Sequence, residues 1–306
     1  MMTTRTIHRL RTRRSALRAV GLLASALSTL AFPAWRSAAQ PPTLEHGFAE
    51  GDGIRLHYVR AGNGPLILFL HGHPRSWQLW RAQLGEFGRD HLAVAPDLRG
   101  YGGSGQPDAV EAYAMPRLLR DLQGLLDHLG RERCILVGHD WGGYLAWVFA
   151  AAFPSRVERL VIVNGPHPMV FLREVATNPR QIAASQYERA YHAPGAFCEG
   201  GCKMYLADPI KVPASLEGGR DLLTLDLAAR LLAGVAIEPA TPSLAVRVPT
   251  LVIWGMQDPA LLPGLLDGLD DHVAELTILR VADAGHWVVE EQPELVSQAI
   301  RRFIHR

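Results

Sequence analysis

A carboxylate set between glycines is the first group in this chain whose surroundings indicate chemistry. Asp140 follows the apolar run of residues 134–137, with Gly138 two residues before it and Gly142 two residues after it. Four consecutive apolar residues are typical of a buried strand, and the alanine-rich segment after Gly143 predicts a helix. Small flanking residues allow a sharp turn that lifts the central side chain above the sheet. Asp140 is therefore the candidate nucleophile.

A carboxylate at this position decides which bonds the site could break. A serine hydroxyl must lose its proton to a base before it attacks an acyl carbon. An ionised aspartate is already a nucleophile and can displace a leaving group at saturated carbon. The product is an alkyl ester of the enzyme, which water activated by a histidine must hydrolyse with the help of an oxyanion hole. Epoxides and alkyl halides fit this two-step scheme.

The turn, with Asp140 where esterases carry serine, resembles the nucleophile elbow of the α/β-hydrolase superfamily. More narrowly, it resembles the aspartate-nucleophile branch of epoxide hydrolases and haloalkane dehalogenases. The resemblance implies an α/β fold with a mostly parallel, doubly wound sheet and an inserted helical cap. The 267 residues that follow position 39 are enough for one large domain with such an insertion.

The predicted elements follow the same scheme. Apolar runs bounded by turn residues predict strands over residues 44–50, 54–61, 65–70, 91–95, 134–137, 159–163, 249–257 and 276–281. After residue 168 the alternation of strands and helices gives way to short helical pieces, as far as about residue 242. We therefore assign residues 40–167 and 243–306 to the α/β-hydrolase core and residues 168–242 to the helical cap.

Two candidate catalytic groups follow the last two predicted strands. Asp258 and His286 occupy such positions, and open α/β sheets place functional residues where their strands end. His286 resembles the family's general base, and Asp258 resembles the acid that fixes its tautomer and stabilises its cation. Asp283 is a rival to Asp258 by proximity, but three residues from His286 it is better placed to satisfy the local turn.

The strand predicted over residues 65–70 is apolar on both faces and leads into His71-Gly72-His73-Pro74. This loop resembles the family's His-Gly-x-Pro motif. The resemblance implies that the backbone N–H of His73, with that of Trp141, binds the oxyanion formed during ester hydrolysis. The His73 side chain departs from the family, because epoxide hydrolases usually have an aromatic residue here and haloalkane dehalogenases often have asparagine. We interpret this side chain as a simple lining residue.

A tyrosine in the predicted cap completes the candidate site. In epoxide hydrolases a cap tyrosine at a similar distance before a proline donates a hydrogen bond to the epoxide oxygen, and Tyr187 matches it. Ring opening generates an alkoxide, a poor leaving group unless a group such as this hydroxyl protonates it. The alternative is that Tyr187 only packs. The second cap tyrosine of the family is missing from residues 221–230, so either Tyr191 or Tyr205 could replace it, or one donor suffices.

The sequence predicts no cofactor and no metal. The glycine-rich loop over residues 96–104 lacks the Gly-Lys-Ser/Thr of a P-loop and the helix of a dinucleotide fingerprint, so Asp97 and Arg99 are interpreted as structural. Cys134 is the first residue of a predicted strand, and we interpret it as a buried apolar residue. Cys198 and Cys202 could close a small disulfide or remain free thiols, and no histidine follows them at the spacing of a zinc site.

The first 39 residues resemble an export signal. They hold seven arginines and no acidic residue, with a twin-arginine-like segment at residues 12–18, an apolar stretch at residues 19–34, and small residues before Gln40. We predict cleavage after Ala39 and export of the mature protein, which is then either periplasmic or secreted. Removing the seven arginines would leave 24 basic and 30 acidic residues, a net charge of −6. Neither nucleic acid nor stable membrane association is then expected.

Three functions remain open at this level. Epoxide hydrolysis is favoured by Asp140-Trp141, by Tyr187 and by the segment over residues 164–168. Haloalkane dehalogenation is the alternative, with the Trp141 indole as a halide donor but no asparagine at position 73. A binding protein on this fold is the third, although the chain retains the aspartate, aspartate and histidine that such proteins usually lose. The expected partners are water and a small apolar epoxide or halide.

Overall fold

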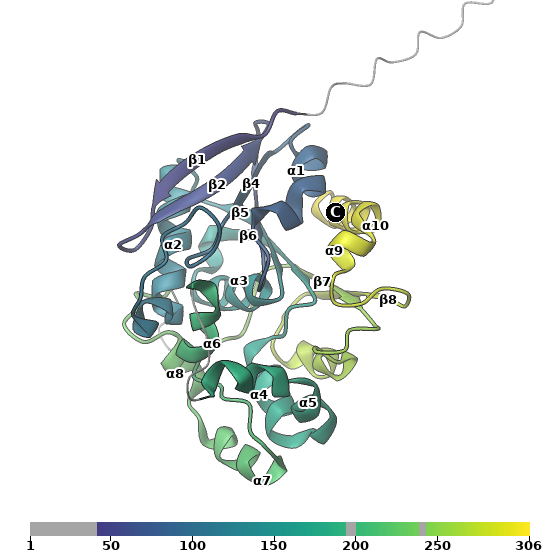
Figure 1. Cartoon of the computed structure of the whole chain (residues 1–306). Coiled ribbons are helices and arrows are strands. Elements are labelled where there is room, and N and C mark those ends of the chain that lie inside the picture. The colour runs from purple at the N-terminus through teal and green to yellow at the C-terminus, as the bar shows by residue number, and fades with distance from the viewer. Residues whose placement is uncertain (1–41, 194–199, 239–242) are drawn as a thin grey trace, which may run out of the picture. The chain divides into compact units, whose positions relative to one another are not determined.

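The computed structural model describes residues 42–193, 200–238 and 243–306. One eight-stranded sheet runs through this part of the chain, in the order β1-β2-β4-β3-β5-β6-β7-β8 (Figure 1). Its strands are β1 Glu45–Glu50, β2 Arg55–Ala61, β3 Leu66–Leu70, β4 Leu92–Pro96, β5 Cys134–His139, β6 Val157–Val163, β7 Thr250–Gly255 and β8 Leu276–Val281. β1 and β2 pair antiparallel with their neighbours, and the other pairs are parallel. The predicted α/β fold is confirmed.

The central strands are buried on both faces because helices cover the sheet on either side. The residues of β3 and β5 are all buried, as expected for the middle of a parallel sheet. One face packs against α2 (Met115–His128) and α3 (Trp141–Ala152), and the other against α1 (Arg81–Phe87) and α10 (Pro293–Ile304). The short helix α9 (Val288–Glu291) precedes α10.

Helices α3 and α2 differ in pattern because they occupy different places. The apolar residues of α2 lie on one stripe, whereas every residue of α3 after Trp141 is buried. A helix that is apolar all round must be covered all round. The sheet covers one side of α3, and segments that follow β6 pack over the rest, so the element after the elbow is enclosed.

A helical segment lies between β6 and β7, where the sequence predicted a cap. It contains α4 Pro168–Thr177, α5 Pro179–Ala184, the 3₁₀ segment η4 Gln186–His192, α6 Lys203–Ala207, α7 Leu216–Gly219 and α8 Leu227–Leu231. Figure 1 shows these green helices gathered at the end of the sheet where β5 meets α3. The nucleophile elbow is therefore roofed by short helices rather than exposed.

The loop after β4 is held by buried charges. His57 donates to the Asp97 carboxylate at 2.8 Å, and that carboxylate also accepts the backbone N–H of Trp77 at 2.9 Å. Arg99 makes two hydrogen bonds to Asp121, at 2.8 and 2.7 Å, and all these charged groups are buried. Charge-assisted and bidentate contacts of this kind are strong. Asp97 and Arg99 thus contact structural partners, as their interpretation from sequence requires.

Candidate active site

Asp140 stands on a strained turn between β5 and α3. Its backbone has φ of 53° and ψ of −121°, a conformation that is unfavourable for a residue with a side chain. Gly142 permits the turn, because a Cβ there would lie 2.4 Å from the carbonyl oxygen of Leu70. Buried elements on both sides hold the strain, and it costs about 1–3 kcal/mol for such a residue. The result is a carboxylate fixed above the sheet, only 7 % exposed.

The two oxygens of Asp140 have different surroundings. Oδ1 accepts the backbone N–H of His73 at 2.8 Å, and the backbone N–H of Trp141 also hydrogen-bonds to the carboxylate. A Cβ at Gly72 would lie 2.2 Å from Oδ1, so the loop can approach this closely only with glycine there. Oδ2 lies 3.7 Å from His286 Nε2. One oxygen is therefore anchored by the main chain, while the other faces the imidazole.

The structure brings Asp258 to His286. His286 Nδ1 donates to Asp258 Oδ2 at 2.7 Å, and the backbone N–H groups of Ala260 and Leu261 donate to Oδ1, each at 2.9 Å. Asp258 is only 3 % exposed. Burial alone would raise its pKa, but the hydrogen bond and charge of His286 and the two backbone donors hold that pKa below its usual value. Asp258 is thus a buried carboxylate that remains ionised.

The rival acid lies elsewhere. Asp283 is exposed, and its carboxylate accepts a hydrogen bond from the side chain of Gln292 at 3.5 Å. The loop between β8 and α9 turns its side chain outward while His286 points inward. Proximity in sequence therefore does not make Asp283 the partner of the imidazole.

Asn164 is a residue of the site that the sequence did not identify as a candidate. It directly follows β6 and has a left-handed conformation with φ of 40°. Its Nδ2 donates to Asp258 Oδ2 at 2.7 Å, and its Oδ1 accepts the backbone N–H of Gly255 at 2.8 Å. This amide and His286 therefore contact the same oxygen of Asp258. Its position at a strand end, in the row with Asp140 and Asp258, was the only sequence signal for it.

Two buried histidines support the loops around the nucleophile. His71 Nδ1 donates to the Gly72 carbonyl at 2.9 Å, and its Nε2 accepts the backbone N–H of Leu98 at 3.0 Å. His139 Nε2 donates to the backbone carbonyl of His286 at 2.9 Å. Burial lowers the pKa of His71 to about 4 and that of His139 to about 3, so both are neutral at physiological pH.

The His73 side chain does not simply line the site. Its Nδ1 lies 3.1 Å from the Tyr101 hydroxyl, and its Nε2 lies 3.1 Å from the hydroxyl of Tyr191 in η4. Burial lowers the pKa of His73, which favours the neutral ring. The side chain therefore bridges the core and the helical segment, while its backbone N–H contacts Asp140. Sequence reasoning missed the bridge because Tyr191 is 118 residues away.

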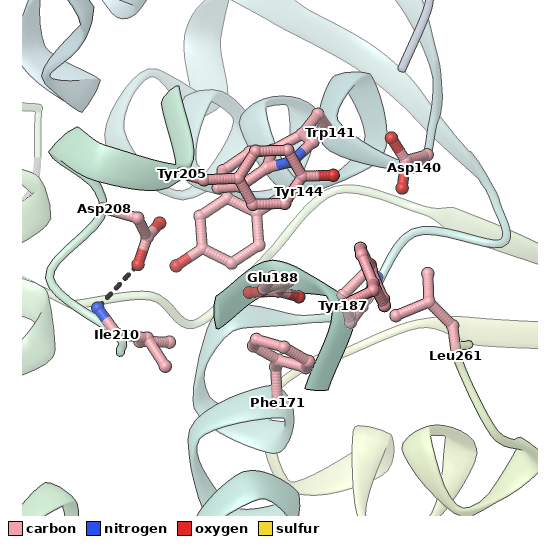
Figure 2. A pocket seen from close by; sticks show the side chains of 11 residues that line it. Asp140, Trp141, Tyr144, Phe171, Tyr187, Glu188, Tyr205, Asp208, Ile210 and Leu261 are labelled. Atoms are coloured by element: carbon pink, nitrogen blue, oxygen red, sulfur yellow. Dashed lines mark hydrogen bonds between the residues drawn. The ribbon is translucent and has the colours of Figure 1, made fainter. Parts of the chain in front are cut away.

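A pocket with an empty volume of about 380 Å³ opens beside Asp140 (Figure 2). Its apolar wall includes Trp141, Phe171, Ile210 and Leu261, and three tyrosines line it. In Figure 2 the hydroxyl of Tyr205 points toward Asp140, whereas that of Tyr144 points toward Asp208. A mostly apolar cavity with a few polar groups is typical of a small-molecule site.

Tyr187 and Tyr205 lie in this pocket near the nucleophile. The Tyr205 hydroxyl is close enough to Tyr187 to lower the pKa of that phenol, although burial and nearby carboxylates raise it well above its usual value overall. Burial and the charge of Asp140 also raise the pKa of Tyr205 well above its usual value. Both phenols keep their protons at neutral pH. Residue Tyr187 remains 40 % exposed, whereas Tyr205 is buried.

Several predictions from sequence fall partly or wholly outside the described residues. The proposed signal, residues 1–39, lies there entirely, and so does Cys198. Cys202 is disulfide-bonded, and Cys134 is a buried free thiol. Within the described ranges no cluster of histidine, cysteine or acidic residues could hold a metal ion. In the same ranges no helix has the length and apolar character that crossing a membrane requires.

The charge of Asp140 and the protonation of His286 are coupled. Burial opposes the charged imidazole, but the hydrogen bond that His286 donates to Asp258 and the charges of Asp140 and Asp258 raise the pKa of His286 above its usual value. Burial is the main cause that raises the pKa of Asp140, and the charge of His286 opposes that rise. Each group therefore stabilises the charged form of the other.

Replacing Asp140 by asparagine should lower the pKa of His286, because the variant keeps the side-chain shape but removes one of the charges that raise that pKa. The imidazole titration, followed by NMR in both proteins, measures the shift. The matched control is Asp283→Asn, which removes a nearby but outward-facing carboxylate and should leave the titration unchanged. An equal pKa in the Asp140→Asn variant and the unsubstituted protein would contradict the coupling.

Comparison with known proteins places this arrangement in a family. A model described as the alpha/beta hydrolase fold matches residues 65–196. Epoxide hydrolase 3 of Xenopus tropicalis is 35% identical over 286 residues, which cover 85% of this chain and 78% of that protein. Epoxide hydrolase 4 of Homo sapiens is 34% identical, with coverage of 82% and 76%.

Solved structures agree. The structure of a Bacillus megaterium epoxide hydrolase in complex with an inhibitor is similar with a TM-score of 0.68 and 30% identity, covering 85% of this chain and 100% of that one. An epoxide hydrolase from metagenomes of hot environments gives a TM-score of 0.72 and 34% identity, with coverage of 86% and 99%. The chain therefore belongs to the α/β-hydrolase superfamily and, within it, to the epoxide hydrolase family.

Proposed function

We propose that the protein hydrolyses epoxides to vicinal diols through an alkyl ester on Asp140. The observation that carries this proposal is that the two oxygens of that carboxylate make different contacts. Oδ1 is held by the backbone N–H of His73, and Oδ2 faces a pocket and lies 3.7 Å from His286 Nε2. The family supports the reaction class, because the relatives compared above are named epoxide hydrolases.

In the first step Oδ2 of Asp140 attacks a carbon of the epoxide. A carbon–oxygen bond forms to Oδ2 as the ring carbon–oxygen bond breaks, and the ring oxygen takes a proton from a tyrosine hydroxyl. Tyr187 and Tyr205 are the proposed donors, because both line the pocket with Asp140. Without such a donor the leaving oxygen would carry a full negative charge in an apolar site, which is costly.

In the second step His286 takes a proton from water through Nε2, and the resulting hydroxide adds to Cγ of the ester. The negative charge then develops on Oδ1, which already contacts the N–H groups of His73 and Trp141. Collapse breaks the bond between Cγ and Oδ2, so that oxygen leaves with the diol. His286 returns its proton to the departing oxygen, and the oxygen from water stays on Asp140. The second proton of that water, left on the Asp140 carboxyl group, returns to the tyrosine that protonated the ring oxygen, so all groups regain their starting states.

The charge of Asp140 gives His286 a different pKa in each of the two steps. Formation of the ester neutralises Asp140 and so removes one of the charges that raise the pKa of His286. The pKa of the imidazole falls at the stage when it must accept a proton from water. Asp258 remains ionised and stabilises the imidazolium that forms. The hydrolytic step should slow as pH falls through the pKa of His286 in the ester, because only the neutral ring acts as a base.

The surroundings of His73 do not favour carbon–halogen hydrolysis. Halide release needs donors that point to the leaving atom, and position 73 would have to supply one beside the Trp141 indole. Both ring nitrogens of His73 are instead within hydrogen-bond distance of tyrosine hydroxyls, at 3.1 Å each. Two phenols beside the nucleophile suit an oxygen leaving group, which needs a proton, better than a halide, which does not.

The purified protein should convert a styrene-oxide-type epoxide to its diol and release no halide from a haloalkane, because the pocket offers proton donors to oxygen. Chromatography of the diol and a halide assay measure the two products. Halide without diol would replace epoxide hydrolysis by dehalogenation. Neither product, over a broad panel of substrates, would favour a binding protein.

The matched variant for this assay is His286→Gln. It keeps the nucleophile but lacks the base, so it should accumulate the ester, and intact mass should show protein plus one epoxide on Asp140. The double variant Asp140→Asn with His286→Gln should stay unmodified under the same conditions. An unmodified His286→Gln protein would contradict the two-step scheme.

Replacing Tyr187 by phenylalanine should slow epoxide opening by about 10²-fold, the lower end for loss of a general acid. Tyr205→Phe should also slow this step, because its hydroxyl is the second proposed donor. Single-turnover kinetics of ester formation measure both effects. The control is Tyr191→Phe, whose hydroxyl contacts His73 and should cause a smaller loss than either. Unchanged rates in Tyr187→Phe would reduce that residue to a packing role.

We also propose that the protein is exported. The seven arginines and apolar stretch of residues 1–39 support this, and so does the disulfide at Cys202, because disulfides persist mainly in oxidising compartments. Protein recovered from the exported fraction should begin at Gln40, as N-terminal sequencing would reveal. A mature chain that begins at Met1 would refute cleavage.

A further inference from the structure

The pocket beside Asp140 contains two carboxyl groups that the proposed reaction does not use. Glu188 comes from η4, next to Tyr187, and Asp208 directly follows α6. Both line the pocket, together with Tyr144 of α3. In Figure 2 Asp208 lies on the far side of the pocket from Asp140, with Glu188 between them. An otherwise apolar cavity therefore has an acidic end remote from the nucleophile.

Neither acid forms an ion pair within the described residues. None of the salt bridges within those residues includes Glu188 or Asp208. Lys211, whose charge acts on both acids, directs its Nζ to the backbone carbonyls of Leu206 at 2.7 Å and Tyr205 at 3.2 Å. Its charge moderates the pKa values of both acids without closing a contact on either.

Burial raises the pKa of both acids, but by different amounts, so their protonation states differ at neutral pH. Burial, with the charges of Asp208 and Asp140, raises the pKa of Glu188 to about 8. Burial raises the pKa of Asp208 to about 6, although the backbone N–H of Ile210 and the neighbouring Tyr144 hydroxyl oppose the rise. At neutral pH Asp208 is largely ionised and Glu188 largely protonated. Asp208 also has a structural contact, because its Oδ1 accepts the Ile210 N–H at 2.6 Å.

The Tyr144 hydroxyl is a second, independent sign of a ligand. The residue is 4 % exposed, and its hydroxyl makes no hydrogen bond of regular geometry within the described part of the chain, although it lies beside Asp208. Leaving a buried polar group unsatisfied destabilises the protein. Buried polar groups are rarely left so, and this one points into the cavity. A bound group that reached this end would supply the missing partner.

We propose that Glu188, Asp208 and Tyr144 form a subsite for a hydrogen-bond donor, a hydroxyl or an ammonium group, carried by the substrate at the end remote from its epoxide. This inference rests on the proposed epoxide hydrolysis and narrows its substrate class. An ionised carboxylate accepts hydrogen bonds strongly, and the phenol both accepts and donates. A terminal methyl group would add no hydrogen bond to those that the three groups already make, and a terminal carboxylate would add like charge beside Asp208.

The experiment compares terminal epoxides that differ only at the remote end. In each of several chain lengths, the remote methyl group is replaced by hydroxyl, by ammonium or by carboxylate. At the chain length that spans the pocket, kcat/KM for the hydroxyl or ammonium substrate should exceed that of the methyl substrate by about 10-fold, the effect of one well-made hydrogen bond to a charged group. The carboxylate substrate should be the poorest of the four.

Variants test whether these three residues cause the preference for a donor-ended substrate. Glu188→Leu and Asp208→Asn should each lower the ratio of kcat/KM for the hydroxyl over the methyl substrate toward 1, and asparagine preserves the acceptor for Ile210. Tyr144→Phe should lower that ratio by about 3-fold without a cost in folding, because the hydroxyl it removes has no regular partner. The control Glu217→Leu removes an exposed cap carboxylate and should leave the ratio unaltered. Because this ratio compares two substrates of the same variant, any effect of the Glu188 substitution on proton donation by its neighbour Tyr187 cancels.

The outcomes separate this inference from the reaction itself. If no epoxide in the panel is hydrolysed, the proposed function fails. If methyl-ended epoxides are hydrolysed and no chain length gives a donor-ended substrate an advantage, the subsite is refuted while the reaction stands. A preference for the carboxylate substrate would also refute the proposed subsite. A donor preference that persists in all three variants would assign the selectivity to another part of the pocket and refute these residues.

Discussion

The contact between one oxygen of Asp140 and the backbone N–H of His73 is the constraint on which the rest of the site depends. It requires a nucleophile in a strained conformation at the end of β5, and a loop after β3 that approaches through Gly72. Because β3 and β5 are adjacent in the sheet, their ends meet and the contact follows from strand pairing. Backbone donors fixed before any charge moves are well suited to stabilise an oxyanion.

The charges around this contact form a chain rather than a set of separate groups. Asn164 and two backbone N–H groups donate hydrogen bonds to Asp258. Asp258 and His286 stabilise each other's charged form, and His286 in turn stabilises the ionised nucleophile. Neutralising Asp140 by ester formation therefore changes the imidazole as well. A single pocket can favour the anion in one step and the base in the next because the two share one electrostatic field.

The helical segment adds the chemistry that the sheet does not supply. Its tyrosines contribute protons next to the nucleophile, and Tyr191 connects to the core through His73. Its two acids and the buried Tyr144 hydroxyl give the cavity a polar end. The same fold with another segment over the elbow would retain a carboxylate nucleophile and lose both the acid catalysis and this selectivity, since site chemistry is carried by what a fold positions.

The sequence alone determined the parts of this protein that depend on local spacing. The apolar run before Gly138 and the glycines around Asp140 dictate a strand, a turn and a helix, because backbone sterics permit few alternatives there. Strands such as β3 and β6 were predicted to within two residues, and Asp258 and His286 were found because each follows a buried strand.

Only the tertiary structure decided which side chains from distant segments meet. It placed Asp258 rather than Asp283 beside His286, brought Asn164 to the same carboxylate, and put Tyr205 rather than Tyr191 in the pocket. It also joined Glu188 and Asp208 around one cavity. These contacts depend on the angles at which short helices cross the sheet, and hydrophobic spacing fixes which face of a helix is buried but not what that face meets.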